Sequence, residues 1–148
     1  MNAPVNVFAA ATKAEQSLAS THEVVNVARE LRDYNLFTQD AVLQQAVQRE
    51  AAGWAQDELT AFGALTGQAE YRELGIVANH VKPELETHDR FGNRIDQVNF
   101  HPAYHQLMKV AFEHGLHSSP WTNPGPGAQV ARAARFYMQA QVEAGHGC

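Results

Sequence analysis

Two histidines four residues apart, His101 and His105, lie in the run HDRFGNRIDQVNFHPAYH at residues 88–105. On a helix this spacing places both imidazoles on one face, where both could bind zinc. The zinc-protease pattern also requires a glutamate directly after the first histidine, and Pro102 stands there instead. A third ligand would have to come from a histidine at no helpful spacing: His88, His114 or His117. We therefore interpret His101 as a helix cap and His105 as a packing or hydrogen-bonding residue.

The segment DRFGNRID at residues 89–96 has a partial likeness to a calcium-binding loop. That loop requires oxygen-bearing side chains at alternate positions and a closing glutamate, and Phe91 stands where a ligand belongs. The F-G-N run is typical of a turn, because Gly and Asn tolerate positive φ. We expect the Asp and Arg side chains to pair locally, to anchor backbone or to meet a partner subunit. The roles of His88, Asp89 and Arg94 stay open among these alternatives.

Three further charged side chains fall near the last predicted helix. Arg132 and Arg135 follow the sequence PGPG, and a phosphate could bind at such a helix N-terminus. The loop lacks the Gly-Lys-Ser/Thr ending of a P-loop, so solvent-exposed salt bridging is the favoured interpretation. Glu143 could be a buried acid with a raised pKa, could face solvent, or could pair with Arg135 or His146. No spacing assigns a catalytic, cofactor-binding or metal-binding residue.

Composition sets outer limits on the functional class. The 148 residues fit one domain, which at this length buries roughly two-thirds of its unfolded surface. The net charge is −5 and the eleven Lys and Arg are scattered, which opposes nucleic-acid binding by this segment. A single cysteine, Cys148, excludes a disulfide within the chain. No apolar run is long enough for a membrane span, and no basic residue precedes VNVFAAA as in a signal peptide. We expect a cytoplasmic protein without membrane contact.

The elements that must position these residues are mainly helices. Residues 1–22 indicate a flexible arm, and residues 23–37 fit either a short helix or an extended strap that packs YNLF onto the body. Hydrophobic periodicity and stop signals predict five helices, over about 38–52, 56–66, 68–79, 102–114 and 128–144. Residues 88–100 are expected to form an irregular loop or a short hairpin, and residues 117–128 a loop that contains Trp121. The fold class is therefore all-α with one irregular insert.

Particular residues are expected at helix ends and on buried faces. Thr38 is the predicted N-cap of the first helix, and Pro102 occupies the first position of the fourth. The third helix should bury Ala69, Leu74, Val77 and Ala78. The fourth should bury Tyr104, Leu107, Met108, Ala111 and Phe112. The fifth should bury one face made of Val130, Ala133, Ala134, Tyr137, Ala140, Gln141 and Ala144.

Six runs in order resemble one known family: YNLFTQD (34–40), QREAAGW (48–54), ELGIVAN (73–79), HDRFGNRID (88–96), FHPAYHQLM (100–108) and ARAARFYMQAQVEAGHGC (131–148). They are similar to the start of AidB-type adaptive-response proteins, the alkylation-response branch of the acyl-CoA dehydrogenase superfamily. The likeness runs from about Thr21 to Cys148.

The resemblance implies a larger parent protein with an N-terminal helical domain, a middle β domain and a C-terminal helical domain. Members hold FAD between the last two parts and form homotetramers. They are linked to protection against alkylating agents, with DNA contacts attributed to the C-terminal part, and some show weak acyl-CoA dehydrogenase activity. By this resemblance the chain ends before the flavin-binding β domain, so no flavin, catalytic or DNA-contacting residue can be carried onto it.

Residues 23–148 are thus expected to be the family's N-terminal helical domain, which covers the flavin or acyl cavity and supports oligomer assembly. Its expected partners are the remaining domains of the flavoprotein and sister subunits. The parent family is an acyl-CoA dehydrogenase-like oxidoreductase, while this segment alone is expected to be inactive and to bind no flavin. The alternative is a stand-alone helical interaction module without catalysis, which partners a separately encoded flavoprotein remainder.

Overall fold

The computed structural model describes residues 25–28 and 30–144. The chain divides into two units, Met1–Glu30 and Leu31–Cys148. The predicted arm over residues 1–22, together with His146 and Cys148, lies outside the described residues. In the first unit, residues 25–28 and 30 are exposed and form no helix. The short helix considered for residues 23–37 is therefore not formed in their described part.

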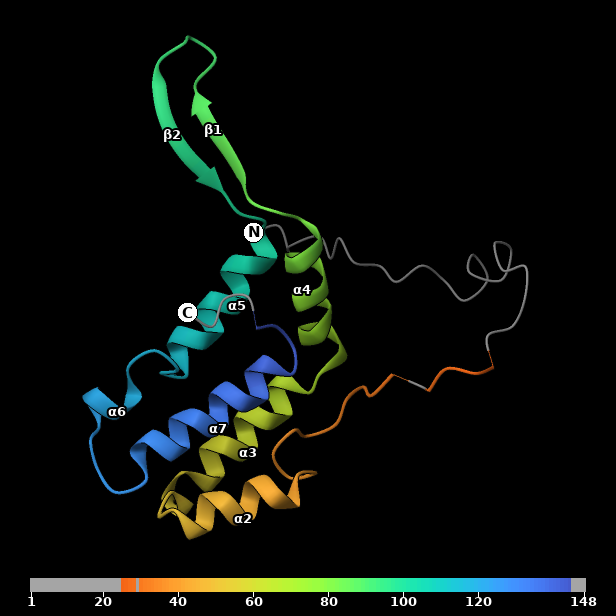
Figure 1. Cartoon of the computed structure of the whole chain (residues 1–148), viewed down its shortest axis with the longest axis vertical. Helices are drawn as coiled ribbons and strands as arrows, with labels where there is room; N and C mark the ends of the chain where they lie inside the picture. Colours follow the sequence, from red (N-terminus) through yellow and green to blue (C-terminus); the bar gives the residue numbers. More distant parts are fainter. Residues whose placement is uncertain (1–24, 29, 145–148) are drawn as a thin grey trace, which may run out of the picture. The chain divides into compact units, whose positions relative to one another are not determined.

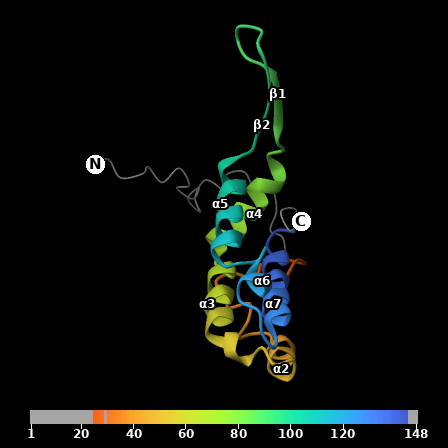
Figure 2. The same ribbon diagram turned by 90° about the vertical axis from the view of Figure 1, so that its left-hand side faces the viewer.

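The second unit consists of helices with one hairpin between them (Figure 1). Its elements are α2 (Ala41–Arg49), the 3-10 turn η1 (Gly53–Ala55), α3 (Gln56–Thr66), α4 (Ala69–His80), β1 (Glu84–His88), β2 (Arg94–Asn99), α5 (Pro102–Glu113), α6 (Ser119–Thr122) and α7 (Ala128–Ala140). Helices α3 and α7 lie side by side, and α4 and α5 run together toward the hairpin (Figure 2). Among the described residues, no helix has the length and apolar character needed to cross a membrane.

The segment YNLF packs onto the body, as the strap prediction had it, but Leu36 and Phe37 lie in a turn over residues 36–39 and not in an extended segment. Leu36 and Phe37 are buried in the core, and the Leu36 N–H donates to the Gly63 carbonyl at 3.1 Å. Asn35 holds the strap on α3, because its Nδ2 donates to the Thr60 carbonyl at 2.9 Å. Its Oδ1 accepts from the Phe37 N–H at 2.9 Å. The described strap thus packs on its own chain.

Helix ends follow local chemistry, with one correction. The N-cap of α2 is Asp40 and not Thr38, because Asp40 Oδ1 accepts from the Leu43 N–H at 2.8 Å. An N-cap side chain satisfies an N–H that has no partner in the first turn. The predicted span of α3 is confirmed, and α5 begins at Pro102 as expected.

The predicted buried faces of two helices are wrong. In α4 the buried residues are Tyr71 and Gly75, while Ala69, Leu74, Val77 and Ala78 are only half-buried. A Cβ on Gly75 would lie 2.8 Å from the Val142 carbonyl oxygen, so this glycine permits close packing of the chain after α7. In α7 only Ala134 of the predicted face is buried, and the actual buried set is Ala128, Ala131, Ala134, Arg135, Met138 and Gln139. Two polar residues share this face because partners on α3 and α4 satisfy them.

The insert between α4 and α5 is a hairpin that begins earlier than predicted. Residues Glu84–His88 pair antiparallel with Arg94–Asn99, with a register shift between Glu86 and His88. Every residue of both strands is exposed. The hairpin extends away from the helices beyond the ends of α4 and α5 (Figure 1). It therefore contributes nothing to the core of the described chain.

The core lies between α2, α3, α5, α7 and the strap. Its largest fully buried side chains are Phe37, Phe62, Leu59, Leu107 and Met138. The predicted loop at residues 117–128 contains the short helix α6, which carries an exposed Trp121.

Candidate functional site

The two histidines of the zinc hypothesis have structural roles. His101 Nδ1 accepts from the Ala103 N–H at 3.2 Å, which confirms the predicted cap of α5. His105 is exposed and lies edge-on to the Tyr104 ring, with 5.6 Å between ring centroids. In the part of the chain that the structure describes, no group of three His, Cys, Asp or Glu could hold a metal ion.

Residues 89–96, which partly resemble a calcium-binding loop, contain a tight turn. This agrees with the expectation that their polar side chains pair locally or anchor backbone. Asp89 Oδ1 accepts from the N–H groups of Phe91 and Asn93 at 2.8 and 2.9 Å, and its Oδ2 accepts from Asn93 Nδ2 at 2.8 Å. These bonds, with the Asn93 side chain contributing most, hold the pKa of Asp89 below its usual value. Gly92 adopts the positive φ of +85° that the turn requires.

Arg135 corrects the prediction of solvent-exposed salt bridging. Its side chain is only 6% exposed and pairs with Glu58 of α3, while Nη1 lies 3.5 Å from Ser119 Oγ. Arg132 donates through Nε to the Leu116 carbonyl and lies over the Trp121 ring at 5.6 Å. Both guanidinium groups are thus engaged within the chain.

The loop before α7 packs against the chain after α2 and against η1. A Cβ on Gly127 would lie 2.3 Å from the Ala51 carbonyl oxygen, so this glycine serves close packing on the end of α2. Trp54 Nε1 donates to the Pro126 carbonyl at 3.0 Å, which ties the same loop to η1. Arg135 lines a small hollow together with Asn123 of this loop and Ala128 at the start of α7, and Arg132 is not among its lining residues.

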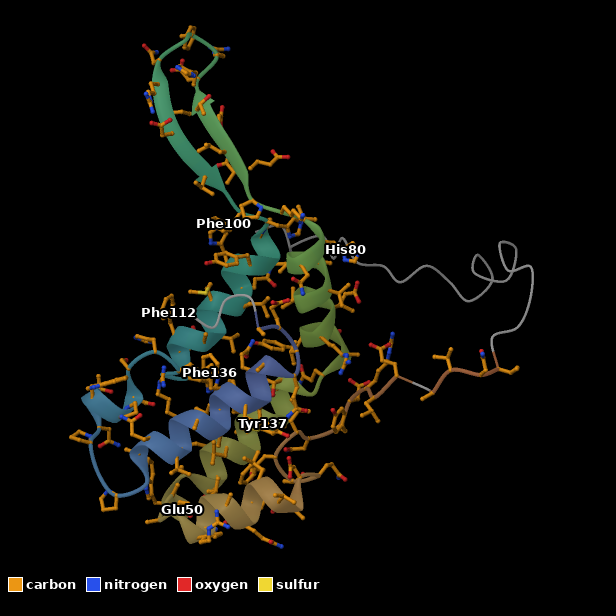
Figure 3. The ribbon with its side chains drawn as sticks, viewed as in Figure 1. Glu50, His80, Phe100, Phe112, Phe136 and Tyr137 are labelled. Carbon is orange, nitrogen blue, oxygen red and sulfur yellow. The ribbon has the colours of Figure 1, made fainter. Side chains whose placement is uncertain are left out.

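A hollow of about 320 Å³ lies where the hairpin joins the helices, and we call it the base hollow. Its walls come from the end of α4, the hairpin base, the start of α5 and the chain after α7: Ala78, Asn79, Val81, Lys82, Pro83, Phe100, His101, Tyr104, Leu107 and Glu143. Phe100 stacks on Tyr104 with 4.3 Å between ring centroids. Figure 3 shows Phe100 at the join between the hairpin and α5, across from His80 at the end of α4.

Glu143 is the acidic residue of the base hollow. It is 7% exposed, so the burial considered among the alternatives is confirmed. It lies beyond the end of α7 and not within a longer helix, because α7 ends at Ala140. Arg135 pairs with Glu58 and not with this carboxylate.

Sequence reasoning missed a buried polar pair between α4 and α7. The Tyr71 hydroxyl donates to Gln139 Oε1 at 2.8 Å. Burial raises the pKa of Tyr71 to about 12. At the end of α5, burial lowers the pKa of His114, whose ring lies 4.9 Å from that of Phe62. The two members of the Tyr71–Gln139 pair are 68 positions apart, so no local spacing could reveal it.

A second feature that the sequence missed is an exposed group of aromatic residues around α6. Phe112, predicted to be buried on α5, is 52% exposed, and Trp121 is 67% exposed. The Phe112 ring meets His117 edge-on, with 4.8 Å between centroids. The Arg132 guanidinium lies 5.6 Å from the centroid of the Trp121 ring and 5.9 Å from that of Phe136. Phe112 and Phe136 are marked on α5 and α7 in Figure 3. We call Phe112, His117, Trp121, Arg132 and Phe136 the aromatic surface.

Comparison with known proteins identifies the family to which this fold belongs. The model of the adaptive response protein AidB N-terminal domain family matches residues 26–148. Over 129 residues the chain is 46% identical to the "Putative acyl-CoA dehydrogenase AidB" of Escherichia coli (strain K12), a match that covers 86% of this chain and 24% of that protein. The chain therefore spans about a quarter of the length of this curated relative.

Two solved structures share the fold. Caenorhabditis elegans ACDH-11, crystallised in complex with C11-CoA, superposes with a TM-score of 0.69 and 18% identity, over 92% of this chain and 24% of that one. The apo-form of Bd2924 superposes with a TM-score of 0.69 and 22% identity, over 80% of this chain and 25% of that one. At these identities the likeness shows the fold alone, and it confirms the predicted helical class.

Proposed function

The chain belongs to the AidB N-terminal domain family, and on this premise we propose that it packs against the flavin cavity of a larger acyl-CoA dehydrogenase-like protein and supports that protein's assembly. The resemblance inferred from the sequence is confirmed at the level of the family. The remaining domains of the flavoprotein and its sister subunits are the proposed partners. FAD, a role in the adaptive response to alkylation and a cytoplasmic location belong to the same proposal, as does DNA contact through the C-terminal part of the parent protein. The domain limits of the 148-residue chain also belong to the proposal: a flexible arm over residues 1–22 and a folded domain over residues 23–148.

The aromatic surface is the observation that supports packing against further domains. Large aromatic side chains and arginine are the residue types that dominate binding energy at protein interfaces. Phe112 and Trp121 expose more than half of their surface, and Arg132 holds the Trp121 ring from one side. A cluster of this kind is typical of a surface that another protein part covers.

We assign no described residue to the flavin. The base hollow, at about 320 Å³, lies at the lower end of the range for ligand pockets, and FAD is a large ligand. The second hollow, at about 70 Å³ beside Trp54 and Arg135, is much smaller. In this proposal the chain helps to enclose a cavity whose cofactor contacts come from the other domains.

A graft tests the proposal. The matching first quarter of the E. coli relative would be replaced by this chain, and the graft compared with a version that carries Phe112→Ser and Trp121→Ser. We expect the unmodified graft to retain flavin and to form an oligomer, and the double variant to lose thermal stability and flavin because the interface loses its two exposed aromatic anchors.

The matched control is Val42→Ser, which changes an apolar side chain that is 77% exposed on α2. This variant should behave like the unmodified graft. A double variant that matches the unmodified graft in stability and flavin content would overturn the assignment of the aromatic surface.

The alternative function is a stand-alone helical interaction module that partners a separately encoded flavoprotein remainder. The same aromatic surface would then bind in trans. The genomic DNA after codon 148 distinguishes the two: an in-frame continuation supports the domain, and a stop codon supports the module.

A further inference from the structure

We propose that helix α4 positions the next domain of the parent protein, because it fixes the path of residues 141–143 as the chain leaves α7. We call residues 141–143 the exit segment. The inference rests on the proposed function, in which the remaining domains of the flavoprotein follow the exit segment along the chain. It gives a positioning role to Gly75 and Tyr71, the two buried residues of α4.

The exit segment is tied back to the last turn of α7. The helix ends at Ala140, yet the N–H groups of Val142 and Glu143 both donate to the Gln139 carbonyl at 3.0 Å. Glu143 is 7% exposed, and Val142 packs against the hydrophobic core. A segment that is both hydrogen-bonded and buried opens rarely, so it leaves the helix in one defined direction.

Tyr71 connects α4 to the residue that holds the exit segment. Its hydroxyl donates to Gln139 Oε1 at 2.8 Å, and both side chains are buried. Gln139 thus uses its side-chain oxygen to bind α4 and its backbone carbonyl to bind the exit segment. Breaking a buried hydrogen bond leaves a polar group without its partner, which is costly. The pair therefore holds α4 and the exit segment at a fixed separation.

Gly75 determines how closely the two approach. A Cβ at this position would lie 2.8 Å from the Val142 carbonyl oxygen and 3.2 Å from the Glu143 Cβ, whereas ordinary van der Waals contact begins at 3.4 Å. Gly75 lies inside α4, where alanine forms helix more readily than glycine. The glycine therefore does not serve the helix itself. It makes room for the exit segment, and a side chain at this position would displace that segment.

A small displacement of the exit segment has a larger effect in the next domain. When the segment rotates, every atom that follows it moves by an amount that grows with the distance from α4. A site that encloses a ligand depends on accurate placement, since an error of about 1 Å can lower its efficiency roughly a hundredfold. We therefore expect flavin binding by the parent protein to depend on Gly75, although the proposed function assigns no flavin contact to α4.

Hydrogen exchange of the full 148-residue chain, followed for single amides by NMR, tests the first step. In Gly75→Ala the amides of Val142 and Glu143 should exchange at least about tenfold faster, because their segment is displaced from Gln139. The Ala131 amide, in the first half of α7, should keep its rate. Tyr71→Phe should act in the same direction but less strongly, since it removes the hydroxyl and leaves the ring.

Flavin affinity of the graft on the E. coli relative tests the second step. We expect Gly75→Ala to weaken flavin binding at least about tenfold, measured by titration of the flavin-depleted graft. The matched control is Val47→Ala, which creates a cavity at a fully buried position on α2 and destabilises the helical domain without a change at the exit segment. The control graft should bind flavin as tightly as the unmodified graft, so that a loss in Gly75→Ala reports positioning and not stability.

Unchanged exchange at Val142 and Glu143 in both α4 variants, or unchanged flavin affinity in both grafts, would overturn the inference. An equal loss of flavin in Val47→Ala would do the same, because lower stability would then explain the result. If Gly75→Ala does not fold, Tyr71→Phe decides the inference by the same two measurements. An unmodified graft that binds no flavin would overturn the proposed function, whereas flavin binding that neither α4 variant changes would remove this inference alone.

Discussion

Replacing Gly67 with alanine should destabilise the protein, although the backbone at this position favours the change. Gly67 is the C-cap of α3 with φ of −81°, a conformation that alanine adopts readily. On backbone entropy alone, Gly67→Ala would stabilise by about 0.4 to 1 kcal/mol. A Cβ at this position, however, would lie 1.6 Å from the Tyr34 carbonyl oxygen, so the strap would have to move.

The magnitude follows from what the strap holds. Its displacement strains or breaks the bond from the Leu36 N–H to the Gly63 carbonyl and the bond from the Ala69 N–H to Asp33 Oδ1, each worth about 1 kcal/mol. It also partly uncovers Leu36, one of the buried core residues, and burial of such a side chain stabilises by about 1.5 to 3 kcal/mol. We therefore expect Gly67→Ala to lower the free energy of unfolding by about 3 kcal/mol, which corresponds to a Tm lower by roughly 6 to 12 °C.

Urea unfolding followed by circular dichroism measures the change, with limited proteolysis after Arg32 as a local probe of the strap. The matched control is Gly125→Ala, because a Cβ on Gly125 meets nothing within 4 Å. The control should change stability by less than about 0.5 kcal/mol. A Gly67→Ala protein as stable as the unmodified chain would refute the close approach between the strap and α3.

Three further predictions concern charged and titratable groups. The pKa of Tyr71 is raised to about 12, so the free energy of unfolding should be constant below the ordinary tyrosine pKa of 10.0 and should fall as the pH rises from there toward 12. Ultraviolet titration of the tyrosines should show one phenol that ionises at higher pH than the others, and Tyr71→Phe should remove it. Glu58→Gln should cost about 1 to 2 kcal/mol in urea unfolding, less than for a fully buried pair because water screens Glu58, and an unchanged midpoint would contradict the pairing with Arg135. The lowered pKa of Asp89 predicts hairpin stability that is present above pH 3.8 and lost as the pH falls through its folded pKa; amide exchange in the hairpin should show this loss, and Asp89→Ala should show fast exchange at every pH.

Local signals in the sequence were sufficient for most helix positions. Pro102 at the start of α5 is a residue whose own backbone chemistry marks a boundary. Gly67 correctly predicted the end of α3, although its φ is helical and its close contact is with the strap. The cap at His101 and the turn at Asp89 also depend on neighbours only a few positions away. Family membership was accessible from the order of several short runs, all of which lie within residues 26–148, the range that the family model matches.

Burial was harder to predict because it depends on partners far along the chain. Arg135 lies on the core face of α7 since Glu58, 77 positions earlier, supplies a carboxylate, and Gln139 lies there with Tyr71 as its partner. A prediction from hydrophobic periodicity alone assigns these polar residues to the solvent-exposed face of the helix. For Phe112 the error is the reverse. An aromatic side chain predicts burial, but Phe112 is exposed because no described element covers it on α5.

The flavin content of two proteins in one buffer tests the central claim most directly, namely that this chain is the helical part of a larger flavoprotein. The visible absorbance of the isolated 148-residue chain should show no flavin, and the graft on the E. coli relative should show stoichiometric flavin. An isolated chain that purifies yellow, or a folded graft that purifies colourless while the intact relative is yellow, would contradict the account.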